Sequence, residues 1–507
     1  MIKLDRAARI LAALVWLSPV ALPGANVDAW VPARWEGGPL ELTRRAAVPD
    51  GAVREAIANW YDPGTLDLLK GTPINCLLVT LSAGASAEVE SQQQRLVKEY
   101  ARRARERQIA VMGIVYAEAD PQAVLKAAGE AGLDGLVLDS EFPEGASRSY
   151  STANLVIPIV RDAASARTAT ARLVAVNGVR PVARDLAEMG IRAGPSSEPW
   201  IDSNIWLVRS FRLGAAPRMI WVNQEPNPSS AGDYTRCVAD AAVAGGRWIV
   251  TLDDDLRLRL YKKESDGLAT WRAIAAYLRF AEEHGEWRGY APYGNLAIIL
   301  DTAGQYPAIS NEYLNLVARR QVPYRIIERS RLDAASLEGL RAVLAADLAP
   351  PTEKERALLR AFAEKGGLVA AGPSWGDPPA NDPYAEVPLG KGRVAVYKDD
   401  PPDPEAVARD MLDLLAPEVM GVTALNVPSV LTYASTAESG RRMLVQLLNY
   451  AGAPFEQTIT IRVNGSYKTA SLYTPENARA ELAARAVRGR TQVSIPRLAA
   501  WGALLLE

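Results

Sequence analysis

Short apolar runs alternate with longer amphipathic stretches from about residue 74 to about residue 255. The runs have the length of strands buried on both faces, and the stretches between them repeat apolar residues at helical spacing. The expected strands are 74–81, 109–116, 133–138, 155–160, 173–176, 191–193, 219–222 and 248–252. Eight strands that alternate with helices predict a parallel sheet closed into a (β/α)8 TIM barrel. Residues 30–49, rich in proline and glycine, are expected to form an extended arm packed on that barrel.

An open, doubly wound sheet is the competing architecture for this region. Such sheets bind phosphate groups at a glycine-rich turn after the first strand. No turn of that kind follows Leu81, because only Gly84 stands between this strand and the next helical stretch. The barrel is therefore the preferred interpretation.

Polar residues follow most of the expected strands. Because the C-terminal ends of barrel strands meet at one mouth, these residues should lie together. They are Asp139 and Glu141 after the third expected strand, Arg161 and Asp162 after the fourth, Asn177 after the fifth, Asn223 and Glu225 after the seventh, and Asp253, Asp254 and Asp255 after the eighth. The aromatic residues that could present flat faces there are Tyr116, Tyr150, Trp206 and Trp221.

Two carboxylates with amides and aromatic rings nearby are typical of glycosidic bond cleavage, where one acid protonates the leaving oxygen and one carboxylate attacks or activates water. The chain has a single histidine and two cysteines, which excludes a serine triad and a zinc site. We therefore predict that Glu225 and one of Asp139 or Glu141 form the catalytic pair, with no cofactor and no metal. The predicted sugar contacts are Asn177, Asn223, Arg161, Trp221 and Trp206, with Asp254 in reserve.

Several of these residues also have a structural interpretation. The three aspartates at 253–255 could be a solvated loop, and the tryptophans could belong to the core. Asp139 could cap the next helix or pair with Arg161 inside the barrel. Glu225 stands between Gln224 and Pro226 in a restricted backbone, which favours a functional role.

The N-terminus has the layout of a secretory signal. Basic residues precede an apolar segment at 10–22, and Pro23 and Gly24 interrupt it before Ala25 and Ala29. We expect an exported protein cleaved near residues 25–29, with an uncleaved anchor as the alternative. No later run approaches the ~20 apolar residues of a membrane span. The formal net charge of −2, with lysine and arginine scattered along the chain, argues against a nucleic-acid partner.

After residue 289 the period of the pattern changes. Strand and helix patterns alternate from 296 to 371 and indicate a compact three-layer α/β domain, which resembles the class I glutamine amidotransferase fold but lacks a cysteine nucleophile. We expect this domain to act as an oligomerisation or lid domain. From about residue 422 the chain is β-rich and predicts an antiparallel sandwich. The expected domains are a signal peptide at 1–29, the barrel at 30–289, the α/β domain at 290–418 and the sandwich at 419–507.

This order of domains, with the strand-like segment Leu444 to Tyr450 opening the sandwich, resembles the three-domain β-galactosidases of clan A glycoside hydrolases. The resemblance implies an acid/base glutamate that follows an asparagine after the fourth barrel strand, and a nucleophilic glutamate at the end of the seventh. Glu225 matches the second position, whereas the fourth expected strand ends in Arg161 and Asp162 without a match. The sequence thus predicts a secreted glycoside hydrolase acting on poly- or oligosaccharide, or alternatively a catalytically inactive carbohydrate-binding or assembly protein on the same body.

Overall fold

The computed structural model describes residues 27–45, 47, 50–139, 142, 145–160, 173–184, 200–213, 219–226, 230–301, 307–345, 350–427, 429–477 and 479–507. Of the predicted signal segment, only the short 3-10 helix Val27–Ala29 lies within these residues. None of the helices among them is long and apolar enough to cross a membrane.

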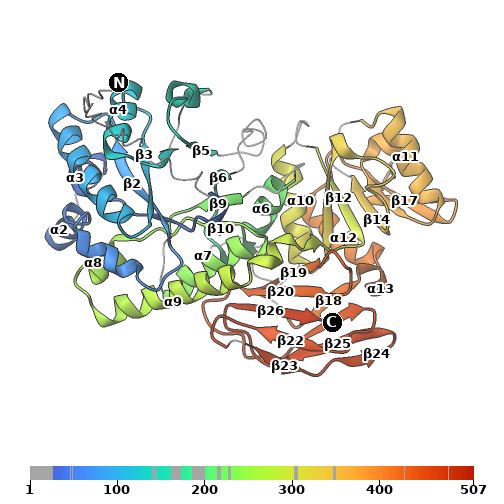
Figure 1. Ribbon diagram of the computed structural model, residues 1–507. Coiled ribbons are helices and arrows are strands. Elements are labelled where there is room, and N and C mark those ends of the chain that lie inside the picture. Colours follow the sequence, from blue (N-terminus) through green and yellow to red (C-terminus); the bar gives the residue numbers. More distant parts are fainter. Residues whose placement is uncertain are drawn as a thin grey trace, which may run out of the picture.

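The first half of the described chain forms a ring of eight parallel strands (Figure 1). In order around the ring they are β1 (Pro32–Arg34), β2 (Cys76–Ser82), β3 (Ala110–Val115), β4 (Gly135–Leu138), β5 (Val156–Val160), β6 (Leu173–Asn177), β9 (Met219–Asn223) and β10 (Arg247–Trp248). Val250, just past β10, pairs in parallel with Ala33 of β1. The backbone nitrogen of Arg34 donates to the oxygen of Val250 at 2.8 Å, which closes the ring. The predicted barrel is therefore confirmed.

The strand count corrects the sequence prediction at two places. Residues 32–34 are not an arm but the first barrel strand, and they are hard to recognise because a three-residue strand is too short to show periodicity. Residues 191–193 lie outside the described residues, but β6 pairs directly with β9, so no strand stands between them. Asp139 consequently follows the fourth barrel strand, Asn177 ends the sixth, and Asn223 still ends the seventh.

Alternation along the strands separates the two sides of the barrel wall. Cys76 and Leu78 of β2 point into the interior with Trp221 of β9, whereas Leu77 and Val79 pack outward against the helices. The helices around the barrel are α1 (Gly38–Arg44), α2 (Gly51–Ala58), α3 (Ala87–Arg105), α4 (Pro121–Ala131), α6 (Ile205–Phe211), α7 (Ala231–Val243), α8 (Asp254–Tyr261) and α9 (Ser265–Glu283). The interior is a packed core rather than a channel, as expected for a barrel of this size.

Local sequence signals explain where these helices begin and end. Before α4, the Asp120 side chain accepts a hydrogen bond from the nitrogen of Ala123 at 3.0 Å, and Pro121 occupies the first turn. Both features favour a helix start. The helix ends at Gly132, whose φ of 64° is in the left-handed region that glycine adopts without strain.

The second body is a six-stranded α/β sheet. Its order is β13 (Tyr324–Glu328), β12 (Leu296–Leu300), β14 (Ala342–Ala345), β15 (Leu368–Ala371), β17 (Gly392–Tyr397) and β16 (Tyr384–Leu389). All neighbours are parallel except β16. Side chains of α10 (Pro307–Arg319) and α12 (Pro404–Leu414) pack on one face, and those of α11 (Glu353–Glu364) pack on the other. The three predicted layers are present.

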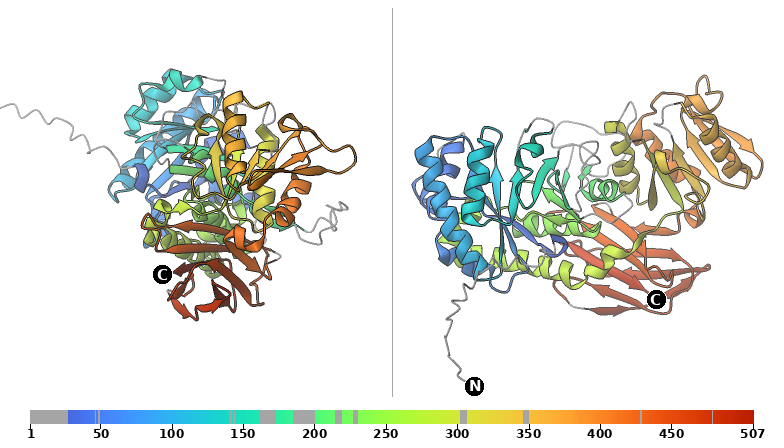
Figure 2. Two further views of the ribbon diagram at one scale, coloured as in Figure 1. Left: turned by 90° about the vertical axis from the view of Figure 1, so that its right-hand side faces the viewer. Right: turned by 45° about the horizontal axis from the view of Figure 1, so that its top comes forward.

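The third body is the predicted antiparallel sandwich. One sheet runs β11 (Ala291–Pro292), β19 (Val430–Thr436), β20 (Met443–Asn449), β26 (Trp501–Leu506), β22 (Ala470–Tyr473) and β23 (Ala480–Leu482). The other runs β18 (Val422–Leu425), β21 (Ile459–Asn464), β25 (Arg490–Ile495) and β24 (Arg485–Val487). The outer face of the first sheet packs on the barrel, because Leu444, Leu448 and Trp501 share a core with α7 and α9. Figure 1 and the right view of Figure 2 show the barrel and the α/β body side by side, with the sandwich beneath them.

Candidate functional site

One layer of polar side chains lies at the C-terminal ends of the barrel strands. The alternation that turns Ile114, Val137, Ala175 and Trp221 inward continues for one more step beyond these residues. The next inward positions are Arg34, Tyr116, Asp139, Asn177 and Asn223. The mouth of the barrel is therefore polar directly above an apolar interior, which is where barrel enzymes place their active sites.

Arg34 connects this layer across the mouth. Its Nη1 donates to Oδ1 of Asn223 at 2.9 Å, and its Nη2 donates to the carboxylates of Asp139 and Glu36. Asn223 Nδ2 in turn donates to Oδ1 of Asn177 at 2.8 Å. Burial alone would lower the pKa of Arg34, but the Glu36 and Asp139 carboxylates outweigh it and raise that pKa. A continuous set of contacts thus joins the ends of β4, β1, β9 and β6.

Asp139 therefore pairs with Arg34, a residue that the sequence prediction placed in the arm. Arg161, the alternative partner, and Glu141, the alternative catalytic carboxylate, both lie outside the described residues. Asp139, Asn177 and Asn223 are brought together as predicted from their positions after strands.

Two further carboxylates at the mouth were missed by sequence reasoning. Glu36 Oε1 accepts hydrogen bonds from Arg34 at 2.9 Å, from Arg44 at 3.0 Å and from the Tyr116 hydroxyl at 3.0 Å. Burial would raise the pKa of Glu36, but the two guanidinium groups lower it to about 2. Glu41, on α1, accepts from Arg44 at 2.7 Å and Arg45 at 3.1 Å. Its burial and the neighbouring Glu36 charge raise the pKa of Glu41.

Glu36 and Glu41 are almost fully buried, and each carboxylate is held by several donors. They fix α1 over the first two strands, and because these donors hold both carboxylates in place, we assign them a structural role. The sequence carried no signal for Glu36, because the strand before it has three residues and shows no period.

Glu225 has the opposite surroundings. It lies two residues past β9, is exposed, and makes no hydrogen bond or ion pair with any of the residues that the structure describes. The preceding Gln224 is turned inward and is only 6 % exposed, whereas the Glu225 carboxylate is open to solvent. Among the predicted catalytic residues that can be placed, Glu225 is the one available to a ligand.

Asp254 and the two predicted tryptophans make structural contacts instead of the predicted sugar contacts. Asp254 opens α8 and binds Arg45 at 2.6 Å and Arg257 at 3.0 Å. Trp221 is completely buried inside the barrel, so it cannot offer a face to a sugar, which corrects its assignment. Trp206, on α6, packs against both the barrel core and the core of the α/β body. It belongs to the contact between these bodies and not to a sugar platform.

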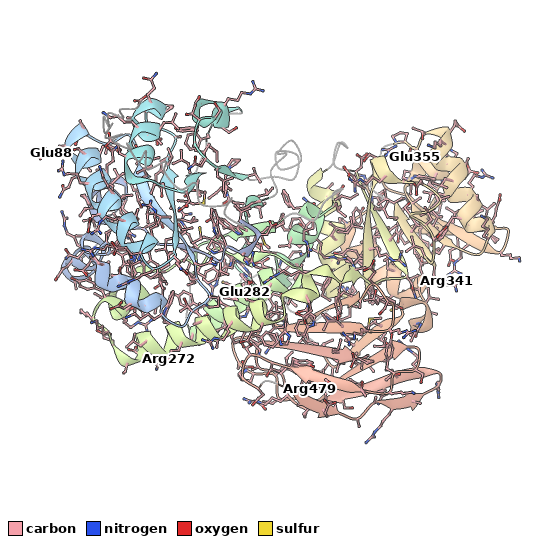
Figure 3. All side chains as sticks on the ribbon, in the orientation of Figure 1. Glu88, Arg272, Glu282, Arg341, Glu355 and Arg479 are labelled. Carbon is pink, nitrogen blue, oxygen red and sulfur yellow. The ribbon has the colours of Figure 1, made fainter. Side chains whose placement is uncertain are left out.

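The single histidine takes part in the contact between barrel and sandwich. His284 follows α9 and stacks on Trp287, with ring centroids 4.1 Å apart and planes inclined by 4°. Close by, Glu282 of α9, labelled in Figure 3, binds Arg247 of β10 at 2.8 Å.

Within the described ranges, no three histidine, cysteine, aspartate or glutamate side chains gather as metal ligands.

Comparisons with known proteins reveal similar folds. No family model and no curated protein matches the sequence. The α-L-fucosidase isoenzyme 2 from Paenibacillus thiaminolyticus aligns with a TM-score of 0.55 and 10% identity, over 94% of this chain and 99% of that chain. A GH42 β-galactosidase from G. stearothermophilus aligns with a TM-score of 0.50 and 10% identity, over 94% of this chain and 98% of that chain. At such identities the likeness shows the fold alone, and it extends over all three bodies.

Proposed function

We propose that this chain is an exported glycoside hydrolase that cleaves poly- or oligosaccharides with a pair of carboxylates. The observation that carries the proposal is the meeting of two carboxylate-bearing segments at one barrel mouth. Asp139 directly follows β4, and Glu225 follows β9, the seventh strand. Arg34 and Asn223 connect the two segments. The fold that the chain shares over 94% of its length with a fucosidase and a β-galactosidase supports the same conclusion.

The corrected strand count strengthens this assignment. In the three-domain β-galactosidases that the sequence resembles, the acid/base residue follows the fourth strand and the nucleophile ends the seventh. With β1 counted, Asp139 and Glu141 follow the fourth strand and Glu225 follows the seventh. Arg161 and Asp162 follow the fifth strand, and Glu141 after the fourth is preceded by Ser140 instead of the asparagine that the resemblance implies.

The surroundings of the carboxylates suggest separate roles. Glu225 is exposed and unengaged among the described residues, so it is suited to attack the sugar or to activate water. Asp139 or Glu141 would act as the general acid and donate a proton to the leaving oxygen. Asn177 and Asn223 line the mouth between these segments and would hydrogen-bond to sugar hydroxyl groups, since an amide offers both a donor and an acceptor.

A catalytically inactive carbohydrate-binding protein is the second candidate, and one contact favours it. Asp139 is held by Arg34, whose guanidinium does not give up its proton. If Glu141 does not supply the acid, this ion pair leaves the mouth with an anchored carboxylate and binding groups only. Export, predicted from the N-terminal pattern, suits either function because both would meet polysaccharide outside the cell.

The two candidates are separated by hydrolysis assays on a broad panel of oligosaccharides and aryl glycosides. The proteins to compare are wild type, Glu225→Gln, Asp139→Asn and Glu141→Gln, with Glu286→Gln as a control for an exposed carboxylate outside the mouth. Loss of a catalytic carboxylate typically costs a factor of about 100 or more in turnover, so Glu225→Gln should be nearly inactive with an unchanged thermal melt. Full activity in Glu225→Gln would refute the proposed pair. Binding of sugars without turnover by wild type would favour the inactive candidate.

A further inference from the structure

A buried polar network leads from the sandwich toward the loop that carries Glu225. Tyr450, directly after β20, is fully buried, and its hydroxyl lies 2.6 Å from Oδ1 of Asp240 on α7 and 2.8 Å from Oγ of Ser203. Ser203 Oγ also donates to the same Asp240 oxygen at 2.7 Å. One hydroxyl of the sandwich thus reaches a carboxylate of the barrel.

The other carboxylate oxygen of Asp240 binds Asn204. Its Oδ2 accepts from the backbone nitrogen and from Nδ2 of Asn204, both at 2.8 Å. A fully buried carboxylate is costly unless its oxygens are satisfied, and here both are. Burial raises the pKa of Asp240, and the hydrogen bonds from Tyr450, Ser203 and Asn204 oppose that rise.

Asn204 holds two loops of the barrel mouth at once. Its Oδ1 accepts from the nitrogen of Val179 at 2.8 Å, and its Nδ2, whose two hydrogens are shared with Asp240, lies 2.8 Å from the Val179 oxygen and 3.1 Å from Oε1 of Gln224. The first loop follows β6 and Asn177, and the second follows β9 and includes Glu225. The fit is tight, because a Cβ atom added at Gly178 would lie 2.5 Å from Oδ1 of Asn204.

Adhesion between barrel and sandwich does not need this network. The two bodies already share an apolar contact that includes Leu444, Leu448 and Trp501, and apolar contacts stabilise without the desolvation cost of a buried charge. A fully satisfied polar network adds rigidity and a single defined geometry. The element it defines here is the pair of loops beside Asn177 and Glu225.

We propose that Tyr450, Asp240 and Asn204 are positioning residues, through which the sandwich fixes the loops of the active-site mouth. The inference rests on the proposed function for its catalytic consequence but not for its structural one. The backbone oxygen of Tyr450 accepts from the nitrogen of Ala183 at 3.2 Å, and Tyr450→Phe keeps this bond. The hydroxyl contacts Ser203 and Asp240, so the effect of removing it must pass through these residues and Asn204.

The test compares Tyr450→Phe with Tyr277→Phe in the full chain. The Tyr277 hydroxyl, on α9, binds Oε1 of Glu476 in the sandwich at 2.6 Å, so the control also removes one tyrosine–carboxylate bond between the same bodies. Backbone hydrogen exchange is measured at Gly178 and Val179, whose nitrogens donate to Asn223 O and Asn204 Oδ1. We expect faster exchange there in Tyr450→Phe and wild-type exchange in Tyr277→Phe.

Kinetics provide the second readout. If the wild type hydrolyses a substrate, we expect kcat of Tyr450→Phe to fall on the order of ten-fold with KM nearly unchanged, because a small displacement of a catalytic group costs rate more than binding. Gln224→Met removes only the last link and should act in the same direction. Equal exchange and equal kcat in Tyr450→Phe and Tyr277→Phe would overturn the inference. Altered exchange without any wild-type activity would sustain the positioning role while refuting the hydrolase.

Discussion

Glu36 holds the segment after β1 in place at the barrel mouth. It is buried among Arg34, Arg44 and Tyr116, and each of these donates to the same carboxylate oxygen. Removing one partner from a buried ion pair leaves uncompensated charge and typically costs about 3–5 kcal/mol. We expect Glu36→Gln to lower the free energy of unfolding by about 3 kcal/mol at pH 7, measured by urea denaturation. The exposed Glu130→Gln serves as a control without effect.

The same residue predicts a pH dependence. The pKa of Glu36 falls from 4.5 to about 2 in the folded chain, so its carboxylate stabilises the fold fully above pH 4.5. This stabilisation is lost as the pH falls through about 2. The stability difference between wild type and Glu36→Gln should therefore shrink between pH 4.5 and pH 2. A difference that stays constant over this range would show that Glu36 is not held as a carboxylate.

At this scale the sequence revealed some site residues and not others. Asp139, Asn177 and Asn223 could be found because each follows an apolar run, and strand ends meet at a barrel mouth. Their partner Arg34 could not, since the pairing joins segments far apart in the chain. Trp221 was assigned wrongly because a strand-end tryptophan looks the same in sequence whether its ring faces the core or the solvent.

Within single elements, close packing limits what a strand can carry. Gly113 of β3 lies against β2, and a Cβ atom added there would be 2.6 Å from Cδ2 and 3.0 Å from Cβ of Leu81. We expect Gly113→Ala to destabilise the chain by about 1–3 kcal/mol through overpacking. Gly129→Ala is the matched control, because Gly129 lies within α4 with no atom close to its missing Cβ. It should stabilise the chain by about 0.5–1 kcal/mol, and thermal melts of both variants check the opposite signs.

Longer strands could be recognised from the sequence, and the shortest one could not. The strands β2, β3 and β9 were predicted at nearly their observed places, because each is a continuous apolar run of strand length. β1 has three residues and was missed. Its place in the barrel is fixed by pairing with β2 and with Val250, which is tertiary information that no local pattern contains.

For the whole molecule, the contact between barrel and sandwich joins the two bodies through one shared apolar core. Trp501 is 2 % exposed, lies edge-on to Phe280 of α9 at 4.8 Å, and donates its indole nitrogen to Gln446 at 3.2 Å. Truncating a buried tryptophan costs about 3–5 kcal/mol. We therefore expect Trp501→Ala to lower the unfolding temperature clearly in calorimetry. Trp375→Ala, in the α/β body and only half-buried, should change it much less.

The closing pair Ala33 and Val250 has a consequence for how the chain is made. During synthesis β1 leaves the ribosome long before Val250, its second pairing partner, has been made. The barrel therefore cannot close until most of its sequence has been translated. Closing so long a loop is also slow, because its entropy must be lost before the contact forms. A nascent chain with this topology therefore has no closed barrel for much of its synthesis.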